Sequence, residues 1–204
     1  MGDLGIDTAV TKVGEGRYTA TLSDEWAIWG PMGGYIASVA LRAAGAESPF
    51  ARPASFTCHY LGVATFDTVD IEVTTLRSAR TALSQRVEIT QGGKRMLEAT
   101  VWSVGEVEFD DPWVDACRSV VLIDVQSWPA ANRPHVDHSF YAPSLDLYVS
   151  FNDPRPASEW LLVDGHGPIA KDGLMAWTGR LWSDDGRLVA SGGGQLLCRH
   201  LPGS

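Results

Sequence analysis

The spacing of hydrophobic and polar positions changes several times along the chain. Residues 7–13 and 17–22 are short runs rich in Thr, Val and Tyr on either side of Gly14-Glu15-Gly16, which predicts a β-hairpin. Residues 35–44 are rich in Ala, apolar around most of a helical circumference and followed by Gly45, which predicts a helix. A helix of this kind must be covered on most sides by other elements.

Four β-like stretches follow this helix. Polar and apolar residues alternate clearly in 70–73 and 85–89, which is typical of an antiparallel sheet with one face toward solvent. Gln91-Gly92-Gly93-Lys94 predicts a hairpin turn. The dry face of the sheet and the apolar helix are expected to cover each other. The four stretches span 54–63, 68–77, 81–91 and 95–104.

The same order of elements recurs in the second half. Residues 113–131 predict a helix with Pro129 at its end or at a kink. Ser183-Asp184-Asp185-Gly186 predicts a second hairpin turn, and the two halves align with Ser55 against Ser144 and Gly93 against Gly186. A duplication explains this order, and chance similarity of two β-meanders is the alternative. The strand-like stretches of this half are 144–151, 159–165, 173–182 and 187–199.

These patterns predict an α+β fold in which a helix followed by a β-meander occurs twice. The first unit is expected to span residues 1–104 and the second 113–204, with the acidic, Pro-containing segment 105–112 as the linker. The second unit is shortened, because the linker leaves no room for an opening hairpin. We expect the two half-domains to share one continuous sheet.

Charge and hydropathy exclude several classes of partner. With 16 basic and 25 acidic residues, the net charge is −9 and the pI is about 4.9, which argues against a surface that binds nucleic acid or an anionic membrane. The most apolar stretches, 35–44 and 119–125, are far shorter than the roughly 20 residues of a membrane span. No basic segment precedes an apolar run at the N-terminus. We therefore expect a soluble, cytoplasmic protein.

The cysteines and histidines do not predict a metal site. Cys58, Cys117 and Cys198 have no CxxC spacing, so neither a disulfide framework nor a zinc site is indicated. Cys58 and Cys198 follow apolar neighbours and are expected to be buried structural thiols, whereas Cys117, beside Arg118, is left open. His135 and His138 flank Asp137 in a loop with no further ligand close in sequence. We expect no metal and no organic cofactor.

Five sequence segments together carry a family resemblance. They are 29–35 (Trp-Gly-Pro-Met-Gly-Gly-Tyr), 58–61 (Cys-His-Tyr-Leu), 144–147 (Ser-Leu-Asp-Leu), 159–162 (Glu-Trp-Leu-Leu) and 185–191 (Asp-Gly-Arg-Leu-Val-Ala-Ser). With them, the chain from about residue 8 to residue 199 resembles the acyl-CoA thioesterase II family. The resemblance implies a double hotdog, in which each of two long helices is wrapped by an antiparallel sheet, with the second hotdog shortened.

The resemblance also implies a catalytic trio of an aspartate, a serine or threonine, and a glutamine. In the family these side chains orient and activate a water against the thioester carbonyl. Asp146 matches the first position and Gln195 the third, to within one residue. The middle position falls in 167–170, Gly-Pro-Ile-Ala, where no hydroxyl exists. This chain therefore departs from the family at one of the three groups that hold the water.

The residues themselves support part of this assignment. Thioester hydrolysis needs a positioned water, a proton acceptor and donors aimed at the developing oxyanion. Asp146 lies between Leu145 and Leu147, and burial on such a strand raises the pKa of a carboxyl toward a useful range. Gln195 offers an amide to the water or the substrate. The alternative is that both side chains lie on the solvated face of a strand and have no role.

Five further residues are candidates for substrate binding. Gly33 and Gly34 open a helix, where unpaired N–H groups favour an oxyanion or a phosphate, although glycines there also permit close packing. Trp29 and Tyr35 are candidates to line an acyl pocket, or else aromatic core residues. His59 is a candidate because hotdog dehydratases use a histidine; otherwise it is a structural histidine at the inner edge of the sheet.

The leading hypothesis is hydrolysis of an acyl-CoA or related acyl thioester by a water that Asp146 and Gln195 orient. Two alternatives stay open: hydration or dehydration of an acyl thioester through His59, and a non-catalytic acyl-binding protein that kept the fold. The shortened second unit leaves a sheet edge that needs covering, which predicts a homodimer or a larger homo-oligomer.

Overall fold

The structure of the protein is a computed structural model that describes residues 2–105, 112–133, 140–153 and 159–200. The first half contains α1 (Leu4–Asp7), β1 (Thr11–Gly14), β2 (Arg17–Thr21), a 3-10 turn (Asp24–Trp26), α2 (Gly33–Glu47), β3 (Arg52–Tyr60), β4 (Thr68–Ser78), β5 (Ala82–Gln91) and β6 (Lys94–Val104). The second half contains α3 (Pro112–Asn132), β7 (Phe140–Tyr141), β8 (Asp146–Phe151), β9 (Leu161–Lys171), β10 (Leu174–Ser183), β11 (Leu188–Leu197) and β12 (Arg199–His200).

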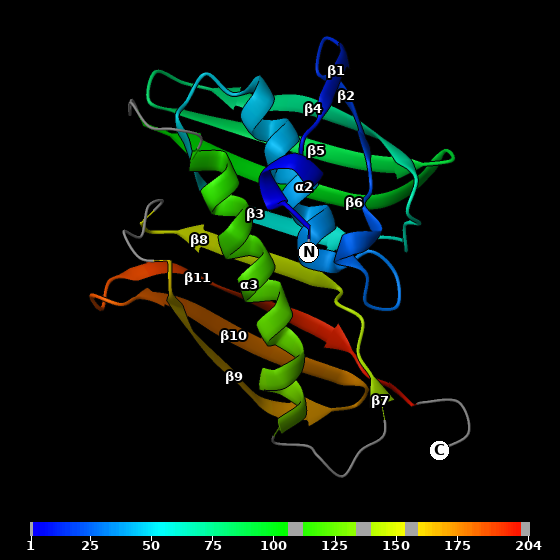
Figure 1. Cartoon of the computed structure of the whole chain (residues 1–204), viewed down its shortest axis with the longest axis vertical. Coiled ribbons are helices and arrows are strands. Elements are labelled where there is room, and N and C mark those ends of the chain that lie inside the picture. The colour runs from blue at the N-terminus through cyan, green and yellow to red at the C-terminus, as the bar shows by residue number, and fades with distance from the viewer. Residues whose placement is uncertain (1, 106–111, 134–139, 154–158, 201–204) are drawn as a thin grey trace.

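Ten of these strands form one antiparallel sheet, and the two long helices lie together against one of its faces (Figure 1). The strand order is β1-β2-β4-β5-β6-β3-β8-β11-β10-β9. The order of the second half mirrors that of the first, with β3 and β8 side by side in the middle. The two halves therefore share one sheet, as expected. We call the paired strands β3 and β8 the seam.

Burial alternates along the strands and separates the two faces of the sheet. In β8, Leu147, Val149 and Phe151 are buried, whereas Tyr148 and Ser150 are exposed. The buried set packs toward the helices, and we call this side the inner face and the other the outer face. The predicted sheet with one solvated face is thus confirmed, because a period of two places every second side chain against the core.

Both predicted helices are present, and both continue past a residue expected to end them. A Cβ at Gly45 would lie 2.5 Å from the ring of Trp113, so this glycine permits α2 to pack closely against α3 rather than ending α2. The helix ends at Glu47. Pro129 lies inside α3, which continues to Asn132. A proline near the last turn removes only one backbone N–H donor, which α3 tolerates.

Each predicted strand of the sheet is present, and β9 departs most from its predicted length. The sequence predicts a strand that ends at Gly165, but β9 continues to Lys171. Gly167 and Pro168 do not end it, because β9 forms an edge of the sheet in the described residues, where a missing N–H is tolerated. Residues 106–111 of the predicted linker lie outside the described residues.

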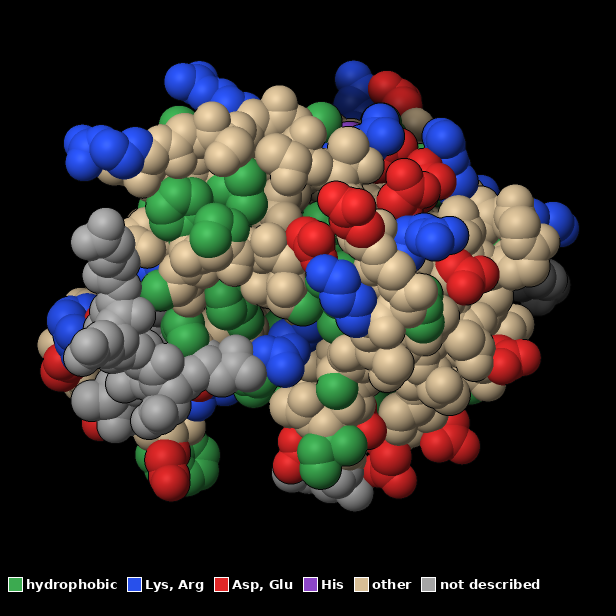
Figure 2. Space-filling view, turned by 90° about the horizontal axis from the view of Figure 1, so that it is seen from above, with side chains coloured by type: hydrophobic (Ala, Val, Ile, Leu, Met, Phe, Trp, Pro, Cys, Tyr) green, Lys and Arg blue, Asp and Glu red, His purple; other side chains and the backbone are tan. Residues whose placement is uncertain are grey.

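The surface carries charges of both signs. Figure 2 shows basic and acidic side chains side by side over one face, next to a group of hydrophobic side chains. The basic side chains on this face (Figure 2) therefore lie among acidic ones instead of forming a separate stripe. None of the described helices is long and apolar enough to cross a membrane.

Candidate active site

A groove of about 450 Å³ lies on the outer face of the sheet and crosses β3, β8, β11 and β10. Strand register explains which side chains meet there: His59 is paired with Asp146, and Ala176 is paired with Gln195. Paired residues of antiparallel strands point to the same face. The structure thus brings together three residues that the sequence singles out, namely His59, Asp146 and Gln195.

Asp146 is held in the groove by one backbone donor. Its Oδ1 accepts a hydrogen bond from the backbone N–H of Gln195 at 2.9 Å. Gly194 makes this contact possible, because a Cβ there would lie 3.0 Å from Asp146 Oδ1 and would clash with the backbone oxygen of Asp146. Among the described residues, Oδ2 accepts no hydrogen bond, so it is available to a water in the groove.

Gln195 and three hydroxyl-bearing residues complete the polar lining of the groove. The side chain of Gln195 is exposed, and only its backbone N–H is used by Asp146. Thr57, Tyr148 and Thr178 line the same groove from β3, β8 and β10. Sequence reasoning did not single out these hydroxyls; their only signal is that they occupy solvated positions of predicted strands.

A second carboxylate lies on the inner face near the seam. Asp124 of α3 is buried, and its Oδ2 accepts the backbone N–H of Gly34 at 2.7 Å. Burial raises the pKa of Asp124 to about 6, while the Gly34 N–H and the Ser144 hydroxyl act in the opposite direction. Met32, at the N-cap of α2, makes no side-chain capping bond. Asp124 therefore caps α2 from the neighbouring helix.

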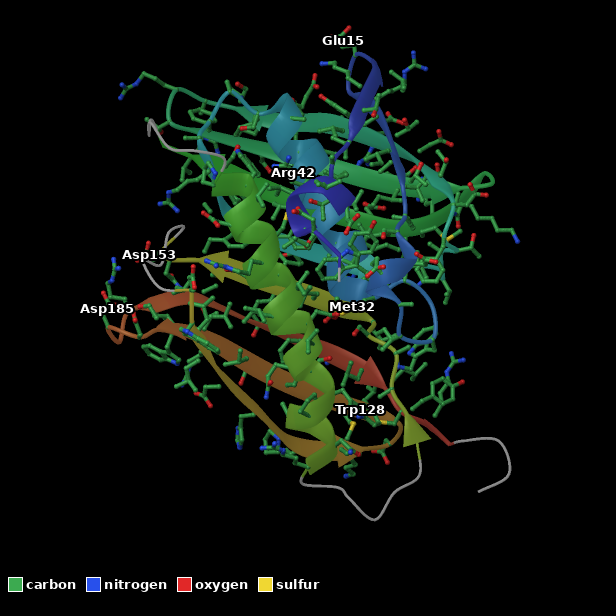
Figure 3. The ribbon with its side chains drawn as sticks, viewed as in Figure 1. Glu15, Met32, Arg42, Trp128, Asp153 and Asp185 are labelled. Atoms are coloured by element: carbon green, nitrogen blue, oxygen red, sulfur yellow. The ribbon has the colours of Figure 1, made fainter. Side chains whose placement is uncertain are left out.

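Sequence reasoning missed Asp124, although a signal was present. It is the one carboxylate within the apolar run 120–125 of the predicted helix. A buried carboxylate in such a run needs a partner. In Figure 3, Met32 marks the start of α2 and Trp128 the lower part of α3, one turn beyond Asp124.

The two glycines that open α2 lie in this inner region. A Cβ at Gly34 would lie 2.8 Å from the Cβ of Asp124, and one at Gly33 would lie 3.1 Å from the hydroxyl of Tyr60. Both glycines permit α2 to approach α3 and β3 closely. The Gly34 N–H is already paired with Asp124, and substrate binding by Gly33 and Gly34 stays a prediction.

Trp29 and Tyr35 do not line the groove. Trp29 is exposed in the segment before α2. Tyr35 is fully buried: its ring stacks on Trp26, and its hydroxyl donates to the backbone oxygen of Asp7 at 2.8 Å and accepts the N–H of Ser23 at 2.9 Å. Tyr35 thereby ties the N-terminal segment to α2. A role of either aromatic residue in an acyl pocket stays a prediction.

None of the three cysteines forms a disulfide bond among the described residues. Cys58 is buried, as expected, and so is Cys117, whereas Cys198, also expected to be buried, is only partly buried. Burial raises the pKa of the Cys58 thiol far above its ordinary value. A thiol of this kind is a poor nucleophile. The described residues contain no group of three or more potential metal ligands, and His135, Asp137 and His138 lie outside the described residues.

Two family comparisons cover most of this sequence. The sequence model of the acyl-CoA thioesterase N-terminal domain matches residues 22–104, and that of the C-terminal domain matches residues 74–196. The chain belongs to the acyl-CoA thioesterase family. This membership makes the protein a thioesterase, whose general activity is the hydrolysis of thioesters.

Solved structures share the fold of this thioesterase. A TesB protein of Mycobacterium avium subspecies paratuberculosis has a TM-score of 0.86 at 20% identity, covering 96% of this chain and 98% of that one. The acyl-CoA thioesterase II TesB2 of Mycobacterium marinum has a TM-score of 0.84 at 17% identity, covering 98% of each chain. A hotdog-fold protein of Alicyclobacillus acidocaldarius has a TM-score of 0.77 at 16% identity, covering 97% and 98%. No curated protein sequence is significantly similar to this thioesterase.

Proposed function

We propose that this thioesterase hydrolyses an acyl-CoA, or a related acyl thioester, in the outer groove, with Asp146 as the base. One observation carries the proposal. Asp146 and Gln195 lie 49 residues apart in sequence, yet they line one groove, where the Gln195 backbone N–H fixes one oxygen of the carboxylate. An oriented carboxylate with a second oxygen open to water is what general-base catalysis requires.

The reaction follows from this geometry. The oxygen of a groove water attacks the thioester carbonyl carbon while Asp146 Oδ2 accepts the proton of that water. The side-chain amide of Gln195 donates a hydrogen bond to the developing oxyanion. The C–S bond then breaks, and Asp146 returns the proton to the leaving thiolate. The products are a free acid and a free thiol, and no oxidant or metal takes part.

The finer architecture is also part of this proposal. We infer a double hotdog, with residues 1–104 and 113–204 as two units joined by 105–112, each with a long helix wrapped by its half of the sheet. The mirrored strand order on either side of the seam supports the duplication. Association as a homodimer or larger oligomer and a location in the cytoplasm stay predictions.

A second candidate activity rests on His59. This histidine lies on the outer face directly opposite Asp146 in the strand register and lines the same groove. An imidazole beside a carboxylate is suited to proton transfer at a carbon next to a thioester, as hydration or dehydration requires. Loss of double-bond absorbance from an enoyl-CoA on incubation with the protein, abolished by His59→Ala, would favour this activity.

Release of free thiol from acyl-CoAs of short to long chain tests the main proposal. Asp146→Asn keeps an oxygen that accepts the Gln195 N–H but removes the group that takes the proton. This substitution is therefore expected to lower kcat by about 10²–10⁴-fold. Asp70→Asn is the matched control, because Asp70 is an exposed carboxylate on β4 outside the groove. A blank without substrate subtracts the signal of the protein's own three thiols.

Three other outcomes would contradict the proposal. Full activity in Asp146→Asn would remove Asp146 from the base role. Equal losses in Asp146→Asn and Asp70→Asn would point to a general effect of surface charge. Binding of acyl-CoA without turnover by the wild-type protein would leave the non-catalytic acyl-binding alternative.

A further inference from the structure

Two neighbouring loops expose apolar side chains, one just before α2 and one just after β3. They span residues 27–32 and 61–66, on the right-hand side of Figure 1. A Cβ at Gly30 in the first loop would lie 3.6 Å from Val63 Cγ1 in the second, so the two loops lie against each other. We call their four large apolar side chains that are between 51% and 66% exposed the apolar rim, namely Ile28, Trp29, Leu61 and Val63.

Hydrogen bonds hold both loops in place. The backbone N–H of Met32 donates to the backbone oxygen of Trp26 at 3.0 Å and closes the first loop at its base. In the second loop, Gln91 Oε1 accepts the N–H of Thr65 at 2.8 Å, and Gln91 Nε2 donates to the backbone oxygen of Thr65 at 3.1 Å. The apolar rim is therefore carried by hydrogen-bonded turns, and the exposure of its side chains is part of the fold.

Neither loop contains a charged residue. Residues 27–41 and 60–66 include no Asp, Glu, Lys, Arg or His, in a chain of which 20% is charged. Single exposed apolar side chains are ordinary on a protein surface, whereas adjoining ones without charges between them mark a surface that contacts another apolar body. The apolar rim stands on loops and does not line a groove, so it suits a soft apolar surface better than a shaped ligand.

The charges next to the loops favour one kind of surface. Asp24 lies before the first loop and Asp67 follows the second, and both are exposed. The N–H of Leu22 donates to the backbone oxygen of Asp67 at 3.1 Å, which keeps the two segments together. In a chain of net charge −9, these carboxylates repel anionic lipids and the same rim of a second copy. They attract the ammonium groups of zwitterionic lipids, which also bind the face of an indole.

We propose that the apolar rim docks on a zwitterionic lipid surface, with Trp29 at the level of the headgroups and the other rim side chains against the outer acyl carbons. An indole suits this level because its ring is apolar and its N–H is polar. The contact is peripheral and needs no helix that spans the membrane. The inference is independent of the proposed function, although docking brings the protein to the surface at which amphiphilic acyl thioesters gather.

Co-sedimentation with vesicles of palmitoyl-oleoyl phosphatidylcholine tests the proposal. Trp29→Glu replaces a buried apolar contact by a carboxylate, so the partition coefficient is expected to fall by about tenfold or more, and Val63→Glu is expected to lower it by about fivefold or more. Ile169→Glu is the matched control, because Ile169 is 64% exposed, like Val63, but lies on β9. It is expected to bind within about twofold of wild type, as an isolated exposed apolar residue.

A second measurement locates Trp29 in the lipid. Phosphatidylcholine vesicles with brominated acyl chains quench the fluorescence of tryptophans that lie close to the bromine atoms, and quenching of the wild-type protein is expected. Trp29→Phe keeps an aromatic apolar side chain, so it is expected to bind like the wild type and to lose most of the quenching, although the other tryptophans remain. Urea midpoints and circular dichroism show whether each variant folds like the wild type.

Several results would overturn the inference. They are no partition into phosphatidylcholine vesicles, tighter binding to vesicles that also contain phosphatidylglycerol, and a loss in Ile169→Glu equal to that in Trp29→Glu. Quenching that persists in Trp29→Phe would place Trp29 outside the lipid. Self-association of the wild type in light scattering, lost in Trp29→Glu while vesicle binding is kept, would assign the apolar rim to a second copy. Binding is measured without thiol release, so each result stands whether or not the proposed function holds.

Discussion

Two aspartates near the seam have similar local contacts and very different surroundings. Asp124 lies on the inner face and accepts the backbone N–H of Gly34, whereas Asp146 lies in the outer groove and accepts the backbone N–H of Gln195. Each carboxylate thus takes one main-chain donor from a distant part of the sequence. Asp124 is only 6% exposed, and Asp146 opens on a groove.

The difference shows why a raised pKa does not by itself identify a catalytic carboxylate. Burial brings the pKa of Asp124 to about 6, which suits a general base at neutral pH. However, one oxygen of Asp124 caps α2, and the side chain lies buried between the two helices. Asp146 has the access to water that Asp124 lacks. We therefore expect substitutions of Asp124 to act on stability and substitutions of Asp146 to act on turnover.

Asp124→Ala is expected to have the largest effect on folding. It removes the acceptor of a buried N–H at the start of α2 and leaves a cavity between the helices. We expect the free energy of unfolding to fall by about 3 kcal/mol, measured by urea denaturation at pH 7. A loss below about 1 kcal/mol would mean that α2 does not depend on this cap.

Gly34→Ala tests the same contact from the other helix. The new Cβ would lie 2.8 Å from the Cβ of Asp124 and 3.0 Å from the Cα of Val121, and the backbone of α3 cannot move aside easily. Overpacking of this kind destabilises by about 1–3 kcal/mol, and the higher helix propensity of Ala offsets about 1 kcal/mol of it. We expect a net loss of about 1–2 kcal/mol by urea denaturation, and an unchanged midpoint would contradict the close approach.

The pH dependence of the unfolding free energy should reveal the titration of the buried carboxyl of Asp124. Its pKa is raised from 3.8 to about 6 in the folded protein, so the native state binds the proton more tightly than the unfolded state, and stability falls as the pH rises through this range. Asp124→Asn does not titrate. We expect the unfolding free energy of wild type minus that of Asp124→Asn to decrease by about 1 kcal/mol between pH 5 and pH 7. A flat or rising difference would contradict a raised pKa.

Asp146→Asn should have the smallest effect on stability. The amide oxygen of Asn can still accept the Gln195 N–H, and the site is open to solvent. We expect the unfolding free energy to stay within about 0.5 kcal/mol of wild type, measured in the same urea experiment. A large loss would place Asp146 with Asp124 as a structural residue and end the contrast between them.

Most helices and strands could be predicted from the sequence because the residue patterns that determine them are local. Alternation predicted the strands, and the Ala-rich run predicted α2. The extension of β9 beyond Gly165 did not follow, because Gly and Pro usually interrupt strands and the sequence does not show that this strand lies at an edge. Asp124 was missed for a related reason: its partner, Gly34, is 90 residues away, and only the packing of α2 on α3 brings them together.

Recognising the groove required both the family resemblance and the three-dimensional structure. The resemblance to a family singled out Asp146 and Gln195, and the register of β8, β11 and β10 showed that they share one groove. That Thr178 lines this groove could be seen only in the structure, since no spacing along the chain relates it to Asp146. The periodicity of hydrophobic residues does not show which residues become neighbours on adjacent strands.

Pro168 also limits how copies of this chain can associate. It lies in β9 where the pairing with β10 shifts register between Ala176 and Thr178, so this edge combines a bulge with a residue that has no N–H. Both features prevent another strand from adding along its whole length, which is how sheets polymerise into aggregates. A second copy is therefore not expected to add a strand along β9, and this edge does not become a template for fibres.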